Sequence, residues 1–249
     1  MSELTRRGTV AILRIAHGKA NALDLELCEE LTGKLRGCAD SDAGALLVTG
    51  EGKIFSAGVD LVRLVDGGAE YVRAFLPALN RLCETLFSFP KPVVAAVNGH
   101  AVAGGCIIAS AADCKLMARD AGRIGIPELL VGVPFPVAPL EIMRFAAPAQ
   151  QLQAMIYRGV MFTADLAHQH GLVDTVVDAD RLLDEAVACA EGLAAVPAVA
   201  FALTKQQLRA PARDRMRAGA AIDAEVTDAW ASPAVLGAIR DYVARTLKR

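Results

Sequence analysis

A single carboxylate stands in an apolar stretch of the chain. The stretch IPELLVGVP, residues 126–134, contains Glu128 directly after a proline. An ionised carboxylate loses its hydration among Ile, Leu and Val side chains, so it needs a partner or a function. As a structural residue it would pair with a buried arginine, for example Arg123 or Arg144. As a chemical group it would have a raised pKa and act as a base.

Two glycine-rich turns each follow an apolar run: IFSAGVDL at 54–61 and NGHAVAGGCI at 98–107. Small residues around Gly58 let a ligand approach the backbone, although an ordinary strand-to-helix turn would look the same. The free N–H groups of a helix that begins at Gly104 attract negative charge. Each turn could present one N–H to the same oxygen, which would form an oxyanion hole. The nucleotide fingerprints GxGxxG and Gly-Lys-Ser/Thr are absent.

Strands and helices alternate over the first two thirds of the chain, which predicts an α/β fold. The predicted strands are Thr9–Ile15, Ala45–Thr49, Val93–Val97, Lys115–Ala118 and Val173–Val177. The predicted helices between them are Asp24–Cys38, Glu70–Phe87 and Gly104–Ala112, and Asp60 is expected to cap the start of a short helix. The remaining segments, Arg181–Leu193, Ala198–Leu208, Arg213–Trp230 and Pro233–Leu247, all have helical spacing. Their apolar stripes must pack on the core or on another subunit.

The composition of the chain limits the classes of molecule that the protein is expected to bind. The chain has 249 residues, 26 Lys and Arg against 28 Asp and Glu, and 54% hydrophobic residues. This balance gives no basic surface for nucleic acid, and no apolar run suits a membrane span or signal peptide, so a cytoplasmic protein is expected. The six cysteines form no CxxC pair and are predicted to be reduced. The histidines lack metal-ligand spacing, so no metal site is expected, and His100 is predicted to be a hydrogen-bonded structural residue.

The motifs IFSAGVDL, AVNGHAVAGGCIIASAADCKLM and IGIPELLVGVPFP, in this order, resemble the enoyl-CoA hydratase/isomerase (crotonase) family. The resemblance covers essentially the whole chain, including KANALD at 19–24. It implies a crotonase-like spiral of ββα units over residues 1–195, which binds an acyl-CoA thioester. It also implies an all-helical oligomerisation region over 196–249, and a homotrimer or a dimer of trimers. No separate cofactor is implied, because coenzyme A is part of the substrate.

The resemblance also assigns residues. The two oxyanion donors fall on the backbone N–H groups of Ala57 and Gly104, and the acid falls on Glu128. Contacts to coenzyme A fall on two segments and on the second turn, namely Lys19, Ala20, Ala22, Leu23, Ser56, Ala57, Gly58, Val59, Asp60 and Gly104. A contact with the phosphates of coenzyme A is a further hypothesis for Lys205, Tyr242 and Arg245, and solvated surface charge is the alternative for Lys205 and Arg245.

One substitution distinguishes between the reactions of the family. Hydratases of the family use two glutamates, and the position of the first is occupied here by Ile107. One carboxylate is sufficient for a 1,3-proton shift, so the pattern resembles the Δ3,Δ2-enoyl-CoA isomerase branch, with Glu128 as the proton shuttle. The alternatives are a hydratase or another crotonase-type lyase or hydrolase, and a member that binds acyl-CoA without turnover. Other candidate acids are Asp66, Glu70 and Glu141.

Overall fold

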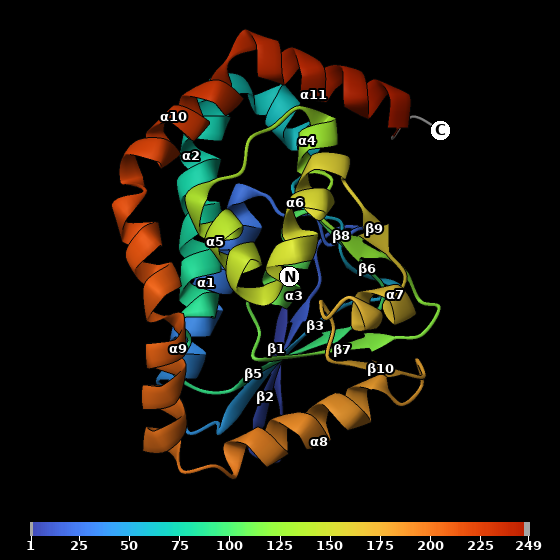
Figure 1. The fold of residues 1–249 in the computed structure, drawn as a ribbon, viewed down its shortest axis with the longest axis vertical. Coiled ribbons are helices and arrows are strands. Elements are labelled where there is room, and N and C mark those ends of the chain that lie inside the picture. The colour runs from blue at the N-terminus through green and yellow to red at the C-terminus, as the bar shows by residue number, and fades with distance from the viewer. Residues whose placement is uncertain (1, 247–249) are drawn as a thin grey trace.

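Two sheets organise residues 2–246, the part of the chain that the computed structural model describes (Figure 1). The larger sheet contains, in spatial order, β1 (Glu3–Arg7), β2 (Val10–Ile15), β3 (Ala45–Gly50), β5 (Val93–Val97), β7 (Cys114–Ala118) and β10 (Thr175–Val177). The smaller sheet contains β4 (Ile54–Ser56), β6 (His100–Val102), β8 (Ile124–Gly125) and β9 (Met161–Phe162). All neighbouring strands are parallel except in the β1–β2 and β8–β9 pairs.

The chain winds between these sheets in repeated units of two strands and a helix. In each unit the first strand joins the larger sheet and the second joins the smaller one. The units are β3–β4–α2, β5–β6–α3 and β7–β8–α4, where α2 is Leu61–Phe87, α3 is Gly104–Ser110 and α4 is Glu128–Val131. This arrangement confirms the predicted spiral of ββα units within an α/β fold.

The central strands of the larger sheet, such as β3 and β5, are buried on both faces, as their continuous apolar sequences predict. Alternate residues of β3 face opposite ways: Leu46 and Val48 join the main core, and Ala45 and Leu47 join a second cluster. The main core includes α1 (Leu25–Ala39) and α2, whereas α8 (Leu182–Ala194) covers the other face. In Figure 1, strands of the larger sheet lie between α8 and these two helices.

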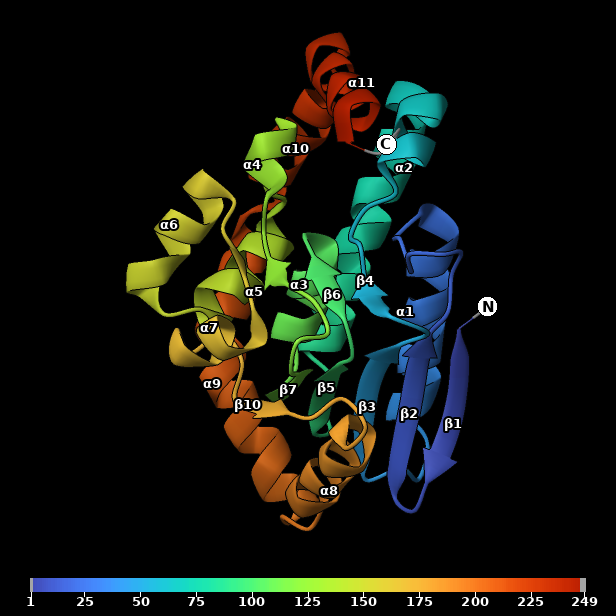
Figure 2. The same cartoon turned by 90° about the vertical axis from the view of Figure 1, so that its right-hand side faces the viewer.

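The remaining helices lie along one side of the core and across its top, opposite β1 and β2 (Figure 2). They are α5 (Val137–Ala146), α6 (Ala149–Arg158), α7 (Ala164–Gln169), α9 (Ala198–Ala218), α10 (Ala220–Ala231) and α11 (Pro233–Thr246). After a bend of 100° between α8 and α9, the tail folds back on its own core, where α9 contacts α5, and α10 and α11 contact α2. A division of the chain near residue 195 falls at this bend and stays a prediction.

Within residues 2–246, no helix taken singly has the length and apolar composition that a membrane crossing needs. The pair α8 and α9 meets that requirement only when both are counted together across their bend.

Several predicted bounds differ from the structure for identifiable reasons. The helix expected from Glu70 begins at Leu61, because Asp60 caps it by accepting a hydrogen bond from the Arg63 N–H at 2.9 Å. Gly68, with φ of 63° and ψ of −156°, is not helical and marks a kink within α2. The tail break predicted before Arg213 was wrong, since α9 continues to Ala218. Leu247, the expected end of the last helix, lies outside the described residues. The sequence also missed β1, whose residues are all exposed, and the short β4, β6, β8 and β9.

A buried ionic cluster fastens α9 to the sheet. Asp113, which directly precedes β7, accepts hydrogen bonds from Lys205 and Arg209, both at 2.6 Å. The two cationic side chains are 7% and 3% exposed, and the Arg209 guanidinium also lies 4.4 Å from the ring centre of Phe87. Burial lowers the pKa of Lys205 to about 8 in spite of Asp113. The hypothesis that Lys205 holds a phosphate of coenzyme A is therefore contradicted, since its ammonium group is buried on Asp113.

We expect Asp113→Ala to lower the free energy of unfolding by about 3–5 kcal/mol, because two buried cations lose their counter-ion. Asp214→Ala is the matched control, since Asp214 pairs with Arg217 at the surface, where both side chains are more than 60% exposed. That control should change stability by less than about 1 kcal/mol. Urea unfolding of the three proteins measures both effects, and similar losses in the two variants would contradict the structural role of Asp113.

Candidate active site

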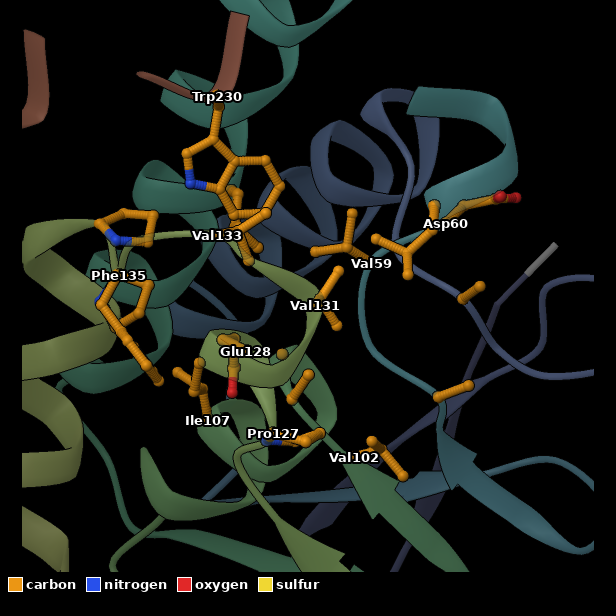
Figure 3. Close-up of a pocket in the computed structure, with 18 of the residues that line it drawn as sticks. Val59, Asp60, Val102, Ile107, Pro127, Glu128, Val131, Val133, Phe135 and Trp230 are labelled. Carbon is orange, nitrogen blue, oxygen red and sulfur yellow. The ribbon is translucent and has the colours of Figure 1, made fainter. Parts of the chain in front are cut away.

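A cavity of about 440 Å³ lies where the two glycine-rich turns meet α4 and the helical tail. Its lining is almost entirely hydrocarbon, and Glu128 and Asp60 are the only acidic residues that contribute to it within the described chain. Figure 3 shows Trp230 and Phe135 on one side of the cavity and Val59 and Asp60 on the other. The cavity therefore combines an apolar interior with one buried acid.

Glu128 is the first residue of α4 and is 8% exposed. Its carboxylate points into the cavity toward Ile107 (Figure 3). Among residues 2–246, neither carboxylate oxygen finds a hydrogen-bond partner. Desolvation raises the pKa of Glu128 from 4.5 to about 8, so the group is mostly protonated at neutral pH. A base with this pKa is suited to taking and returning a proton near pH 7.

The arginines proposed as structural partners of Glu128 are engaged elsewhere. Arg123 donates to the carbonyl oxygen of Met161 at 3.2 Å, and Arg144 donates to Glu141 at 2.5 Å. The interpretation of Glu128 as half of a buried ion pair is therefore wrong. Its burial without a charged neighbour is the condition that the chemical interpretation requires.

The other candidate acids lie outside the cavity. Glu141 is buried, but its two oxygens accept hydrogen bonds from Arg144 and Arg215, both at 2.5 Å. Asp66 and Glu70 are exposed on α2. None of these three residues lines the cavity. The sequence ranked Glu128 first, and of these four acids only Glu128 lines the cavity.

The two segments expected to contact coenzyme A lie side by side. The Leu23 N–H donates to the Gly58 carbonyl at 2.7 Å, and the Asp60 N–H donates to the Leu23 carbonyl at 2.9 Å. Ala20 and Ala22 line the cavity with Asp60, whereas Leu23 is buried behind it. The structure thus brings residues 20–23 and 57–60 together at one side of the cavity.

One predicted oxyanion donor is wrong in this structure. The N–H of Ala57 already donates to the Ala20 carbonyl at 3.0 Å, so it cannot serve a ligand. In the described part of the chain, the N–H groups of Val59 and Gly104 make no hydrogen bond, and both residues line the cavity. The two backbones are in contact, since a Cβ built on Gly104 would lie 3.9 Å from the Val59 nitrogen. Val59 therefore replaces Ala57 beside Gly104.

Backbone strain fixes the second turn. Ala103 has φ of 51° and ψ of −121°, a conformation that L-residues rarely adopt. Its own N–H donates to the Gly125 carbonyl at 2.8 Å, which holds the turn against β8. As the first residue of α3, Gly104 has an N–H with no acceptor inside the helix, and the conformation of Ala103 sets the orientation of the peptide that carries this N–H.

Of the other residues predicted to contact coenzyme A, only some line the cavity. Ser56 is fully buried and its hydroxyl donates to the Asn21 carbonyl at 2.8 Å, which makes it a support for the first turn. Lys19 is exposed and does not line the cavity. Tyr242 of α11 does line it, whereas Arg245 is exposed and donates to the Asp241 carbonyl at 3.2 Å.

The histidines lie away from the cavity. His100 is exposed and its Nδ1 accepts a hydrogen bond from the Arg123 N–H at 3.3 Å, as a structural residue would. His17 contacts Asp24 at 2.7 Å. Residues 2–246 contain no group of three or more His, Cys, Asp or Glu side chains that could hold a metal ion.

The sequence did not identify Trp230 as a residue that closes the cavity. Trp230 is 2% exposed, and its indole N–H donates to the Pro134 carbonyl at 2.8 Å. Together with Tyr242 it brings α10 and α11 to the site. The apolar stripes of these helices predicted packing without showing where, so no local signal linked them to Glu128.

The raised pKa of Glu128 makes stability depend on pH. Between about pH 4.5 and 8 the folded protein holds a proton on Glu128 that the unfolded chain releases. The free energy of unfolding therefore falls as pH rises through this interval. We expect Glu128→Gln to gain up to about 1.4 kcal/mol per pH unit over the wild type in this interval. Urea unfolding at several pH values measures the gain. Glu70→Gln, at an exposed position, should follow the wild type, and a constant difference between Glu128→Gln and wild type would contradict the assignment.

Comparisons with known proteins show the family to which the chain belongs. The family described as enoyl-CoA hydratase/isomerase matches residues 5–236. The 2,3-dehydroadipyl-CoA hydratase of Escherichia coli is 30% identical over 225 residues, which span 89% of this chain and 87% of that protein.

Solved structures share the fold. A Mycobacterium tuberculosis protein, described as an enoyl-CoA isomerase in one structure and as a probable enoyl-CoA hydratase in another, superposes in the first with a TM-score of 0.81 at 31% identity, over 88% of this chain and 95% of that one. The human mitochondrial Δ3,Δ2-enoyl-CoA isomerase superposes with a TM-score of 0.93 over 99% of this chain and 98% of that one, and at 24% identity it supports the fold alone. By sequence and by structure, this chain belongs to the enoyl-CoA hydratase/isomerase (crotonase) family.

Proposed function

We propose that the protein is an enoyl-CoA isomerase that moves the double bond of an acyl-CoA thioester from Δ3 to Δ2. The observation that carries this proposal is the single unpartnered carboxylate of Glu128 beside Ile107, in a cavity that also presents two free N–H groups. One acid and one oxyanion hole are sufficient for a proton shift.

The proposed reaction has two proton transfers on one side chain. Ionised Glu128 removes a proton from C2, and the electrons of the C2–H bond pass into the thioester to form a dienolate. The dienolate oxygen accepts hydrogen bonds from the N–H groups of Val59 and Gly104. Protonated Glu128 then returns the proton at C4, which leaves the double bond between C2 and C3. No other reactant is consumed, and coenzyme A takes part only as the substrate's carrier.

The apolar lining supports this reaction. Ile107 is 3% exposed and offers no hydrogen bond to a water molecule, whereas hydration needs a water that is held and deprotonated. Val133, Phe135 and Trp230 provide hydrocarbon contacts for an acyl chain. The edge of the cavity at Ala20, Ala22 and Asp60 would receive coenzyme A. The proposal also includes a homotrimer or a dimer of trimers, located in the cytoplasm.

Hydration of a 2-enoyl-CoA is the second candidate. It is favoured by the name of the Escherichia coli relative, a hydratase that is 30% identical to this chain. In such an enzyme, Glu128 alone would have to hold and activate the water. The two candidates are separated by supplying a 3-enoyl-CoA and crotonyl-CoA to the same preparation and identifying the products.

We expect the wild type to convert the 3-enoyl-CoA and to hydrate crotonyl-CoA slowly or not at all. Glu128→Gln should lower kcat for isomerisation at least about 10³-fold, because the amide cannot accept the C2 proton. For the wild type, kcat/KM should rise with pH and level off above about pH 8, where Glu128 becomes ionised. Asp66→Asn and Glu70→Gln are matched controls that should keep normal rates. Fast hydration without detectable isomerisation would sink the proposal.

The spacing of the two turns provides a separate test. Gly58 has φ of +81°, and a Cβ there would lie 2.6 Å from the Val102 carbonyl oxygen. We expect Gly58→Ala to push the turns apart and to lower kcat about 10²-fold or more, as loss of one oxyanion donor does.

Gly52→Ala controls for backbone strain alone, because Gly52 has φ of +71° with nothing within 4 Å of its would-be Cβ. Both variants should lose about 1–2 kcal/mol of stability through the positive φ, but only Gly58→Ala should lose turnover. Equal rates in the two variants would argue against an oxyanion hole at this contact.

A further inference from the structure

Two cysteines meet away from the cavity, at the contact between the larger sheet and α8. Cys114 is the first residue of β7 and Cys189 lies on α8, and their sulfur atoms are 3.3 Å apart. Both side chains are half-buried, whereas the four other cysteines are fully buried. We propose that Cys114 and Cys189 form a thiol–disulfide exchange site, which reacts with a small-molecule disulfide such as oxidised glutathione and closes into a cross-link between β7 and α8.

The contact gives the two thiols different roles. The pKa of Cys189 is lowered to about 7, because its thiolate accepts a hydrogen bond from Cys114, while burial and Asp174 act in the opposite direction. The same hydrogen bond raises the pKa of Cys114, with burial adding to the effect, while Lys115 lowers it. Within this proposal Cys189 is the attacking thiolate, because a thiol with a pKa near the ambient pH exchanges fastest, and the single-cysteine variants described below test that assignment. Cys114 keeps its proton until the second step.

The exchange proceeds in two displacements. The Cys189 thiolate attacks one sulfur of the small disulfide, so that a mixed disulfide forms and one small thiolate leaves. Cys114 then loses its proton and its sulfur attacks the sulfur of Cys189, which releases the second small thiolate. The protein loses two hydrogens and the small disulfide gains them, so atoms and electrons balance. The sulfur atoms need to approach by little more than 1 Å from 3.3 Å to reach bonding distance.

The cross-link would fasten the helix that covers one face of the sheet. In the described chain, the second hydrophobic cluster takes its helical members from α8 alone, through Leu182, Ala186, Val187 and Ala190. The bond would join positions 75 residues apart, and closing a loop of that length restricts the unfolded chain. Oxidation should therefore raise the melting temperature by several degrees. Neither cysteine lines the active-site cavity, so turnover should not change.

The test uses the reduced full-length protein and oxidised glutathione. We expect the number of free thiols to fall by two, the mass to fall by about 2 Da, and a peptide map to contain a link between residues 114 and 189. The melting temperature should rise and return to its starting value with dithiothreitol. An unchanged thiol count, a link between other cysteines, or an oxidised protein that melts no higher would overturn the proposal.

Three variants assign the roles of the sulfur atoms. Cys114→Ser should stop at a glutathione adduct on Cys189, because the second displacement is lost. Cys189→Ser should form neither the adduct nor the cross-link. Cys38→Ser removes a buried thiol outside the pair and should cross-link as the wild type does. An adduct that persists on wild-type Cys189 would show that Cys114 does not resolve it, and the proposal would fail.

Discussion

The desolvation of one carboxylate is the constraint on which the site depends. Glu128 is buried with no hydrogen bond and no cation in the described chain, which costs stability whenever it is ionised. The surrounding fold tolerates this cost because the spiral core is large and apolar on both faces of its main sheet. The same environment keeps the acid protonated near neutral pH and strengthens it as a base once ionised, so the proposed reactivity has its physical basis in a local loss of stability.

The geometry of the two turns depends on hydrogen bonds made outside the cavity. Leu23 forms hydrogen bonds with the residues on either side of Val59: its N–H donates to the Gly58 carbonyl, and its carbonyl accepts from the Asp60 N–H. The Val59 N–H therefore makes no hydrogen bond in the described chain. On the second turn, Gly104 is the first residue of α3, so its N–H has no acceptor within the helix, and the strained backbone of Ala103 orients it. Both donors are therefore fixed before a ligand arrives, and fixed donors need little reorganisation when negative charge develops.

The sequence predicted the repeating elements and the acid, but it did not predict which peptide groups are free. Strands such as Val93–Val97 are continuous apolar runs, and Glu128 contrasts with its neighbours, so both are visible locally. The choice between Ala57 and Val59 depends on a hydrogen bond to Ala20, which is 37 positions away from Ala57 and has no sequence signal. Short strands such as β8, with two residues, also escape detection because their pairing is set by the sheet and not by periodicity.

The helical tail connects the buried ion cluster, which holds α9 on the sheet, with the cavity that contains Glu128. Trp230 and Tyr242 close the cavity, and they belong to helices that follow α9 in the chain. α9 in turn is fastened to the sheet where Lys205 and Arg209 bind Asp113. The ion cluster thus lies outside the cavity but fixes the helix from which the cavity's cover extends. The ion cluster and the acid are therefore connected through the helices of the tail, although they do not touch.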